Sequence, residues 1–135
     1  MAYFALIPSE GVELVAGPRV ESVQWWPIDE AMSLHLAFDH NAILAAALDR
    51  VRAKVEYTSL AVSLLPETFT LPELQRIHEI VLGRVRDKSA FRTRMLAADI
   101  LEPTGETRAS GKRRAVVYRR KPQAEHVIFP RMFYA

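Results

Sequence analysis

Basic side chains gather in two short stretches toward the C-terminal end of the chain. In the first, residues 88–98, helical periodicity places on one apolar face Phe91, Met95 and Ala98. The opposite face and its flank then carry Ser89, Arg92, Thr93 and Arg94. Arginine can pair with guanine edges through two hydrogen bonds, and Ser and Thr can reach bases or phosphates. The stretch therefore predicts a helix that reads the major groove of DNA.

The second stretch, residues 108–114, holds four basic residues and no acid. Gly111 allows a tight backbone turn within it. We therefore expect a polar, basic loop from Thr107 to Arg114 that acts as a wing, resting on phosphates or entering the minor groove. Each stretch alone is also compatible with an ordinary solvated basic surface. Their succession along the chain favours DNA binding.

The candidate DNA-binding residues follow from these two stretches. Base reading is expected from Ser89, Arg92 and Thr93. Phosphate contacts are expected mostly from Lys88, Arg94, Lys112, Arg113 and Arg114. Thr70, at the start of an earlier helix, completes the predicted set of DNA-binding residues.

Charge is distributed unevenly along the sequence. Residues 1–83 carry 5 Lys/Arg and 11 Asp/Glu, a net charge of −6. Residues 84–121 carry 12 Lys/Arg and 4 Asp/Glu, a net charge of +8. The basic segment contains both candidate stretches, so the asymmetry indicates a polyanion partner such as DNA.

Catalytic and metal-binding patterns are absent from the sequence. There is no cysteine, which excludes a disulfide scaffold, a thiolate zinc site and a cysteine nucleophile. The histidines, none of which forms an HxxxH or HxH pair, are His35, His40, His78 and His126. There is no Walker loop, no GxGxxG and no apolar run long enough to span a membrane. We therefore expect no catalytic residue, no metal site and a cytoplasmic location.

The elements that would position the basic stretches are mainly helical. Helices are predicted from Asp39, which can cap the first, and then over residues 59–64. A third helix runs from the capping residue Thr70 to Gly83, a natural helix stop, and Asp87 can cap the fourth. A β-type run over residues 115–119 completes the order of a winged helix-turn-helix.

The N-terminal part predicts a different kind of structure. Residues 3–7 and 20–26 each read as a short strand, and residues 28–32 suggest a helical turn. Two or three strands cannot form a stable sheet alone, so this part must pack on something else. The apolar tail over residues 126–134 is also suited to packing, on this chain or on another.

Several spaced motifs together resemble one known family. They are residues 36–40, Tyr57-Thr58, residues 64–66, residues 69–75 and residues 87–92. These motifs, within residues 34–120, are similar to the C-terminal winged helix of the Nudix-related transcriptional regulators, bacterial repressors of NAD-metabolism genes. Residues 1–33 resemble the last strands and last helix of the Nudix-like domain that precedes it, with a typical closing pattern at residues 25–30.

The sequence departs from this family at two places. The Glu-rich Nudix box is absent, so the resemblance implies no hydrolase activity, and an ADP-ribose-type effector only where a complete Nudix-like domain exists. Otherwise no cofactor is expected. The wing sequence Gly111-Lys112-Arg113-Arg114-Ala115 replaces the family's Gly-Arg-Pro pattern and is more basic.

The resulting prediction is an α+β fold, mostly α: a winged helix-turn-helix with a short N-terminal β segment left from a Nudix-like domain. The expected divisions are residues 1–37 for the remnant, 38–122 for the DNA-binding domain and 123–135 for the tail. The expected function is that of a homodimeric, sequence-specific regulator, with repression as the expected sign. The alternatives are a protein-interaction winged helix and a fragment of a Nudix-like nucleotide hydrolase.

Overall fold

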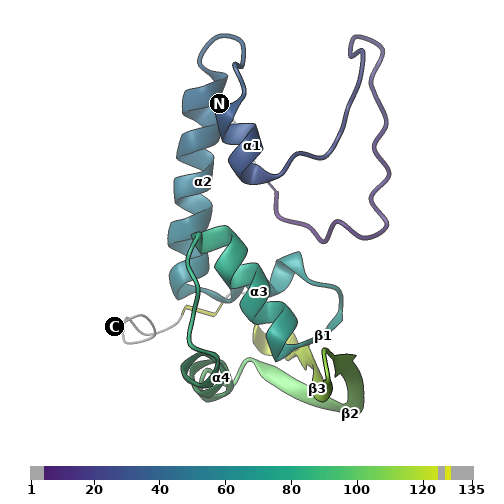
Figure 1. Ribbon diagram of the computed structural model, residues 1–135, viewed down its shortest axis with the longest axis vertical. Coiled ribbons are helices and arrows are strands. Elements are labelled where there is room, and N and C mark those ends of the chain that lie inside the picture. Colours follow the sequence, from purple (N-terminus) through teal and green to yellow (C-terminus); the bar gives the residue numbers. More distant parts are fainter. Residues whose placement is uncertain (1–4, 125–126, 129–135) are drawn as a thin grey trace.

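The computed structural model describes residues 5–124, 127 and 128. Its elements follow in the order α1, α2, η1 (a 3-10 helix), β1, α3, α4, β2, β3 and η2 (a 3-10 helix, Pro122–Ala124). Figure 1 shows that α2 lies along the long axis of the molecule and that α3, α4 and the small sheet surround its C-terminal end. No helix in the described part of the chain is long and apolar enough to cross a membrane.

The N-terminal segment does not form the predicted strands. Residues 5–26 contain no strand, and they trace a wide loop away from the helices before α1 (Ile28–Ser33) begins (Figure 1). Residues 3 and 4 lie outside the described part. Most of this segment is exposed, with Trp25 at 59% and Trp26 at 44%. The alternating pattern fails because a strand needs a hydrogen-bonded neighbour, and the segment meets none here. Only the helical turn over residues 28–32 is confirmed.

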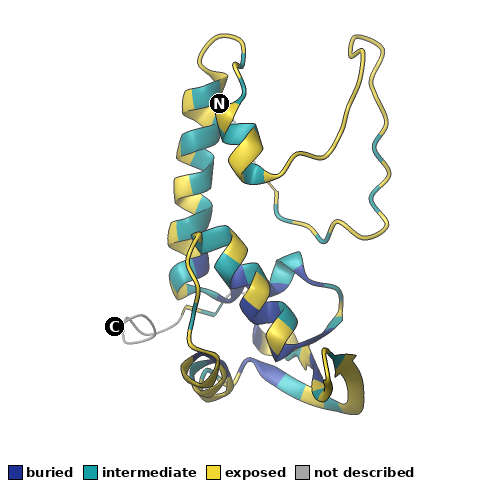
Figure 2. Ribbon diagram, in the orientation of Figure 1, coloured by how far each residue is buried: buried dark blue, intermediate teal, exposed yellow. Residues whose placement is uncertain are grey.

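Helix α2 (His40–Tyr57) connects the N-terminal part to the winged domain. Asp39 occupies its N-cap position as predicted, but the side chain makes no capping hydrogen bond. Asn41 instead secures the entry: its amide nitrogen donates to the Leu34 carbonyl at 2.7 Å, and its oxygen accepts from the Leu36 amide at 2.9 Å. Only Val55, near the far end, is fully buried, so α2 contributes to the core with its last turns (Figure 2).

The predicted helix starts and stops of the next elements are confirmed. Thr58 caps η1 (Ser59–Leu64) by accepting a hydrogen bond from the Leu60 amide at 3.2 Å. The short strand β1 (Thr68–Thr70) leads directly into α3 (Leu71–Leu82), whose first turn forms a full capping box. Gly83 ends α3 in the left-handed conformation at φ 66°.

Helix α4 (Lys88–Ala97) follows a short turn and is capped by Asp87, whose Oδ1 accepts from the Ala90 amide at 2.8 Å. The strands β2 (Leu101–Ser110) and β3 (Arg113–Arg120) then form a long antiparallel hairpin. With β1 they make one sheet in the order β1-β3-β2. This arrangement confirms the winged helix-turn-helix.

The wing differs from the loop predicted over residues 107–114. The strands continue to Ser110 and restart at Arg113, which leaves a turn of only Gly111 and Lys112. Polar residues can form paired strands here because the backbone hydrogen bonds of a hairpin do not require an apolar face. Both faces of this part of the hairpin are solvated, so its side chains remain polar. Gly111 has φ 61°, which confirms its role in the tight turn.

The core lies where α2, η1, α3, α4 and the base of the sheet meet. Its least exposed large side chains are Phe69, Leu74, Met95, Ile100, His78 and Val55. Figure 2 shows this buried region at the lower end of α2, while most of the outer face of α4 and the wing tip is exposed. The core thus holds α4 by Phe91 and Met95, as predicted, and leaves its other face free.

Part of the apolar tail packs on this chain. The Ser59 amide donates to the Val127 carbonyl at 3.0 Å, and Ser59 Oγ accepts from the Val127 amide at 3.2 Å. Val127 also packs partly buried against the core. The rest of the predicted tail segment, apart from Ile128, lies outside the described residues.

Candidate nucleic-acid interface

Helix α4 turns a polar face to solvent. Ser89, Arg92 and Thr93 are all exposed, on the side of the helix opposite the buried Phe91 and Met95. Leu96 extends this face by one turn and is 40% exposed. Sequence reasoning did not select Leu96, although its spacing of three from Thr93 and seven from Ser89 would have placed it there.

The wing presents further cations at its turn and at the start of β3. Lys112 and Arg113 are exposed, and within the described residues neither side chain has a hydrogen-bond or ion-pair partner. Arg114 is also exposed, but its guanidinium crosses the hairpin to Thr107. It donates to the Thr107 hydroxyl at 2.7 Å and to the Thr107 carbonyl at 2.9 Å. Arg114 therefore braces the hairpin as well as adding positive charge.

A groove of about 600 Å³ joins the helices to the wing. The basic side chains along it come from both helices and the turn between them: Arg76, Arg86, Lys88 and Arg92. Ser110, the last residue of β2, closes its wing side. The two basic stretches of the sequence therefore lie beside each other in the fold, as a shared DNA surface requires.

The turn between α3 and α4 is held by a small polar cluster. Glu79 Oε1 accepts from the Arg86 amide at 2.8 Å and from Gln75 Nε2 at 2.9 Å. Gln75 Nε2 also donates to the Arg86 carbonyl at 2.9 Å. The hydrogen bond from the Arg86 backbone, followed by that from Gln75, lowers the pKa of the Glu79 carboxyl. These bonds fix the chain just before α4 begins.

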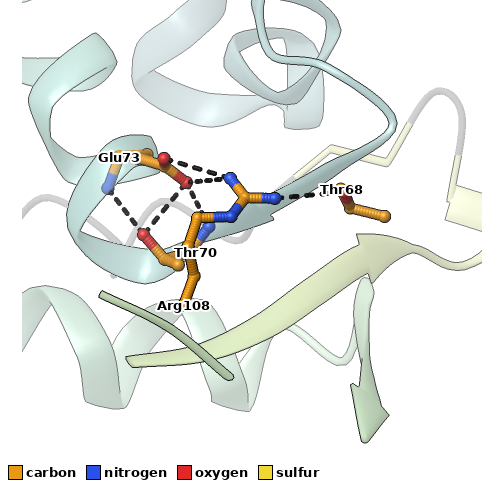
Figure 3. A network of polar contacts seen from close by, with 4 residues as sticks. All are labelled: Thr68, Thr70, Glu73 and Arg108. Carbon is orange, nitrogen blue, oxygen red and sulfur yellow. Dashed lines mark hydrogen bonds and ion pairs between the residues drawn. The ribbon is translucent and has the colours of Figure 1, made fainter. Parts of the chain in front are cut away.

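Thr70 has a structural position rather than an exposed one. It is 2% exposed, and its hydroxyl accepts from the Glu73 amide at 3.4 Å and lies 3.0 Å from Glu73 Oε2. Glu73 Oε2 in turn accepts from the Thr70 amide at 2.6 Å (Figure 3). The Thr70 side chain therefore belongs to the capping box of α3 and is not accessible at the surface.

Glu73 connects this cap to the wing. Arg108 Nη1 lies 3.2 Å from Glu73 Oε1, and Arg108 Nη2 donates to the Thr68 hydroxyl at 3.3 Å (Figure 3). Burial raises the pKa of the Glu73 carboxyl, but the Thr70 hydrogen bonds and the Arg108 charge outweigh burial and lower it. The carboxylate is therefore held in its charged form.

The remaining predicted residues take distinct positions. Lys88 is exposed at the start of α4, whereas Arg94 is half-buried on its flank. Six of the predicted DNA-binding residues are exposed on α4 or at the wing, and within the described residues their side chains make no hydrogen bond or ion pair: Lys88, Ser89, Arg92, Thr93, Lys112 and Arg113. Among the described residues, no group of three or more His, Cys, Asp or Glu could hold a metal ion.

Known proteins resemble this chain in sequence and structure. Residues 61–120 match the family model described as the NrtR DNA-binding winged helix domain. The ADPR responsive transcriptional repressor NtrR of Acinetobacter baylyi is 42% identical over 130 residues, which cover 96% of this chain and 52% of that protein. The chain thus spans about half the length of this relative.

Two crystal structures of Shewanella oneidensis NrtR have the same fold. The structure in complex with a 27mer DNA has a TM-score of 0.70 at 38% identity, covering 78% of this chain and 48% of the other. A second structure has a TM-score of 0.70 at 37% identity, covering 82% and 52%. Both agree with the family that the sequence motifs resemble. Residues 61–120 of this chain are therefore similar, in sequence and in fold, to the NrtR DNA-binding winged helix domain.

Proposed function

We propose that the chain binds double-stranded DNA sequence-specifically and acts as a transcriptional repressor. The observation that carries this proposal is the exposed polar face of α4 beside the basic wing, joined by one groove. A similar protein is crystallised with DNA, and another is named as a repressor, which supports the proposal. The matched regulators also support a binding function over a hydrolytic one.

In this proposal α4 enters the major groove and the wing follows the phosphates. Arg92 pairs with a guanine edge, while Ser89 and Thr93 contact neighbouring bases. Leu96 would add an apolar contact to a thymine methyl group, for which a side chain 40% exposed on the same face is suited. Lys112 and Arg113 neutralise phosphates, which adds affinity without sequence information.

The effector and the assembly are proposed separately. The Acinetobacter relative is named as responsive to ADPR, and we propose such a response only for a chain that also carries a complete Nudix-like domain. A homodimer on a two-fold symmetric operator is the assembly we propose, because paired winged helices would read two half-sites. Sedimentation of the chain with and without DNA tests the dimer.

Fluorescence anisotropy tests the proposed function directly. The 135-residue chain is titrated against labelled duplexes from promoters of NAD-metabolism genes and against a scrambled duplex, each at two salt concentrations. Tight binding to one promoter that survives the higher salt supports a sequence-specific regulator. Equal, weak binding to all duplexes that disappears with salt would refute it and favour a protein-interaction module.

A further inference from the structure

The wing hairpin is interrupted near its base. Residues 101–103 of β2 pair with residues 118–120 of β3, and residues 107–110 pair with residues 113–116. The register shifts between Pro103 and Thr107, where β2 contains more residues than the facing part of β3. A bulge of this kind interrupts the ladder of hydrogen bonds. The outer half of the hairpin, residues 107–116, is therefore joined to the sheet less firmly than the base.

Apolar packing does not hold this outer half in place. The base contributes Leu101 and Tyr118 to the core, both of them buried. Within the described chain, no residue from 107 to 116 belongs to the core cluster or packs against it. Another contact must determine where the tip of the wing, Gly111-Lys112, is presented.

Arg108 supplies such a contact. It lies opposite Ala115 on β3, and Val117, two residues further, lies opposite Thr70 on β1. Because side chains two residues apart on a strand share a face, Arg108 and Thr70 lie on the same face of the sheet. The Arg108 side chain reaches across the middle strand to Glu73 at 3.2 Å and to Thr68 at 3.3 Å (Figure 3).

We propose that Arg108 is a positioning residue, which fixes the wing against the start of α3 and does not itself contact phosphate. Its charge is matched by Glu73, whereas Lys112 and Arg113 have no such partner within the described residues. The pair is exposed, at 45% for Arg108 and 43% for Glu73, so it adds little to global stability. Its effect is to restrict the orientation of the tip. The role in DNA binding rests on the proposed function.

Backbone ¹⁵N relaxation of Gly111 and Lys112 in the free chain tests the positioning alone. Arg108→Met removes the guanidinium and keeps an unbranched side chain. We expect the order parameters to fall from about 0.85 toward 0.6 in this variant, the range that separates rigid from flexible backbone. Unchanged values in Arg108→Met would overturn the proposal.

Two further variants identify the partner. Glu73→Gln keeps an oxygen that can accept from the Thr70 amide, so the capping box survives while the charge that attracts Arg108 is lost. We expect it to increase the mobility of the tip, though less than Arg108→Met does. Glu106→Gln is the matched control, because it removes one exposed carboxylate from β2 without touching the ion pair. Equal mobility in all three variants would also refute the assignment.

Salt dependence of DNA binding distinguishes positioning from phosphate contact. Arg113→Met should reduce the slope of log K against log salt concentration by about one, the loss of one neutralised phosphate. Arg108→Met should weaken binding about two- to fivefold at every salt concentration with the slope unchanged, as expected for loss of an exposed ion pair. A slope reduced by about one in Arg108→Met would overturn the proposal.

Failure of the proposed function gives a different result. If the wild-type chain does not bind DNA specifically, the titrations fail for every variant, whereas the relaxation data still show whether Arg108 orders the tip. If wild-type binding is specific, Arg108→Met combined with Glu73→Gln should lose no more affinity than Arg108→Met alone, because the two residues act as one unit. Additive losses in the double variant would instead refute a shared role.

Discussion

His78 of α3 and Phe91 of α4 meet edge to face, with ring centroids 5.2 Å apart and an interplanar angle of 70°. The two side chains are 2% and 8% exposed. Their contact joins the two helices of the helix-turn-helix directly beneath the face that carries Arg92. Burial, and then the nearby charge of Arg86, lowers the pKa of His78 to about 4. The two helices are therefore packed around a neutral imidazole.

This buried histidine makes stability depend on pH. In the unfolded chain His78 titrates near its ordinary pKa of 6.5, and in the folded chain near 4. Between these values the unfolded state binds more protons, so stability is complete above pH 6.5 and decreases as the pH falls toward 4. The difference corresponds to about 3 kcal/mol of unfolding free energy. Urea denaturation at a series of pH values measures it.

A variant separates His78 from the other titrating groups. His78→Leu should flatten the pH dependence between pH 6.5 and 4, even if it lowers the stability at neutral pH. His40→Gln, which changes an exposed histidine on α2, should leave the profile as in the wild type. A profile that keeps its full slope in His78→Leu would show that other groups cause the dependence.

Local signals in the sequence predicted the helices and the winged-helix fold well. Thr70, Gly83 and Asp87 mark helix ends through hydrogen bonds and backbone conformations that involve only nearby residues. The prediction of N-terminal strands was wrong because strand formation is not decided by nearby residues alone. Whether residues 20–26 form a strand depends on a neighbouring strand that the local pattern does not reveal. The wing was predicted as a loop because its residues are polar and show no strand pattern, although their backbone pairs with β3.

The candidate site could be predicted only in part. Exposure on α4 follows from helical spacing, so Ser89, Arg92 and Thr93 lie on one accessible face as expected. The ion pair between Glu73 and Arg108 joins residues 35 apart in sequence, and no local pattern indicates it. The buried position of Thr70 likewise depends on the sheet that forms around it.

Arg92→Ala should weaken binding to the cognate DNA site by about 1–3 kcal/mol, because one bidentate base contact is lost. Discrimination against substitutions at the contacted base pair should relax at the same time. Anisotropy titrations with the cognate duplex and with single-base variants measure both effects. The fold should be unaffected, since Arg92 is exposed on α4.

Arg50→Ala serves as the charge-matched control for this experiment. Arg50 is exposed on α2, away from the groove, and its replacement by alanine removes the same unit of charge as Arg92→Ala does. We expect it to leave cognate affinity close to that of the wild type. Unchanged affinity in Arg92→Ala, or an equal loss in both variants, would refute α4 as the reading helix.

Thr70→Ala should destabilise the chain by about 0.5–2 kcal/mol, the usual contribution of an N-cap hydroxyl. The hydroxyl accepts from the Glu73 amide, and its loss leaves that donor without its partner in the first turn of α3. Thr70→Ser keeps the hydroxyl and should retain most of the stability. Chemical denaturation of the two variants measures the difference, and equal stabilities would show that the cap contributes nothing.

Gly111→Ala should strain the turn of the wing, because an L-residue rarely adopts φ 61°. A Cβ built at Gly111 meets nothing within 4 Å, so the cost of about 1 kcal/mol comes from the backbone conformation and not from a clash. Gly17→Ala is the matched control, since Gly17 is equally open but has no left-handed φ. We expect chemical shifts of residues 107–116 to change, and DNA affinity to fall, only in Gly111→Ala. Equal chemical shifts and equal DNA affinity in the two variants would contradict this prediction. They would mean that the left-handed conformation of Gly111 does not determine how the basic residues of the wing are presented to DNA.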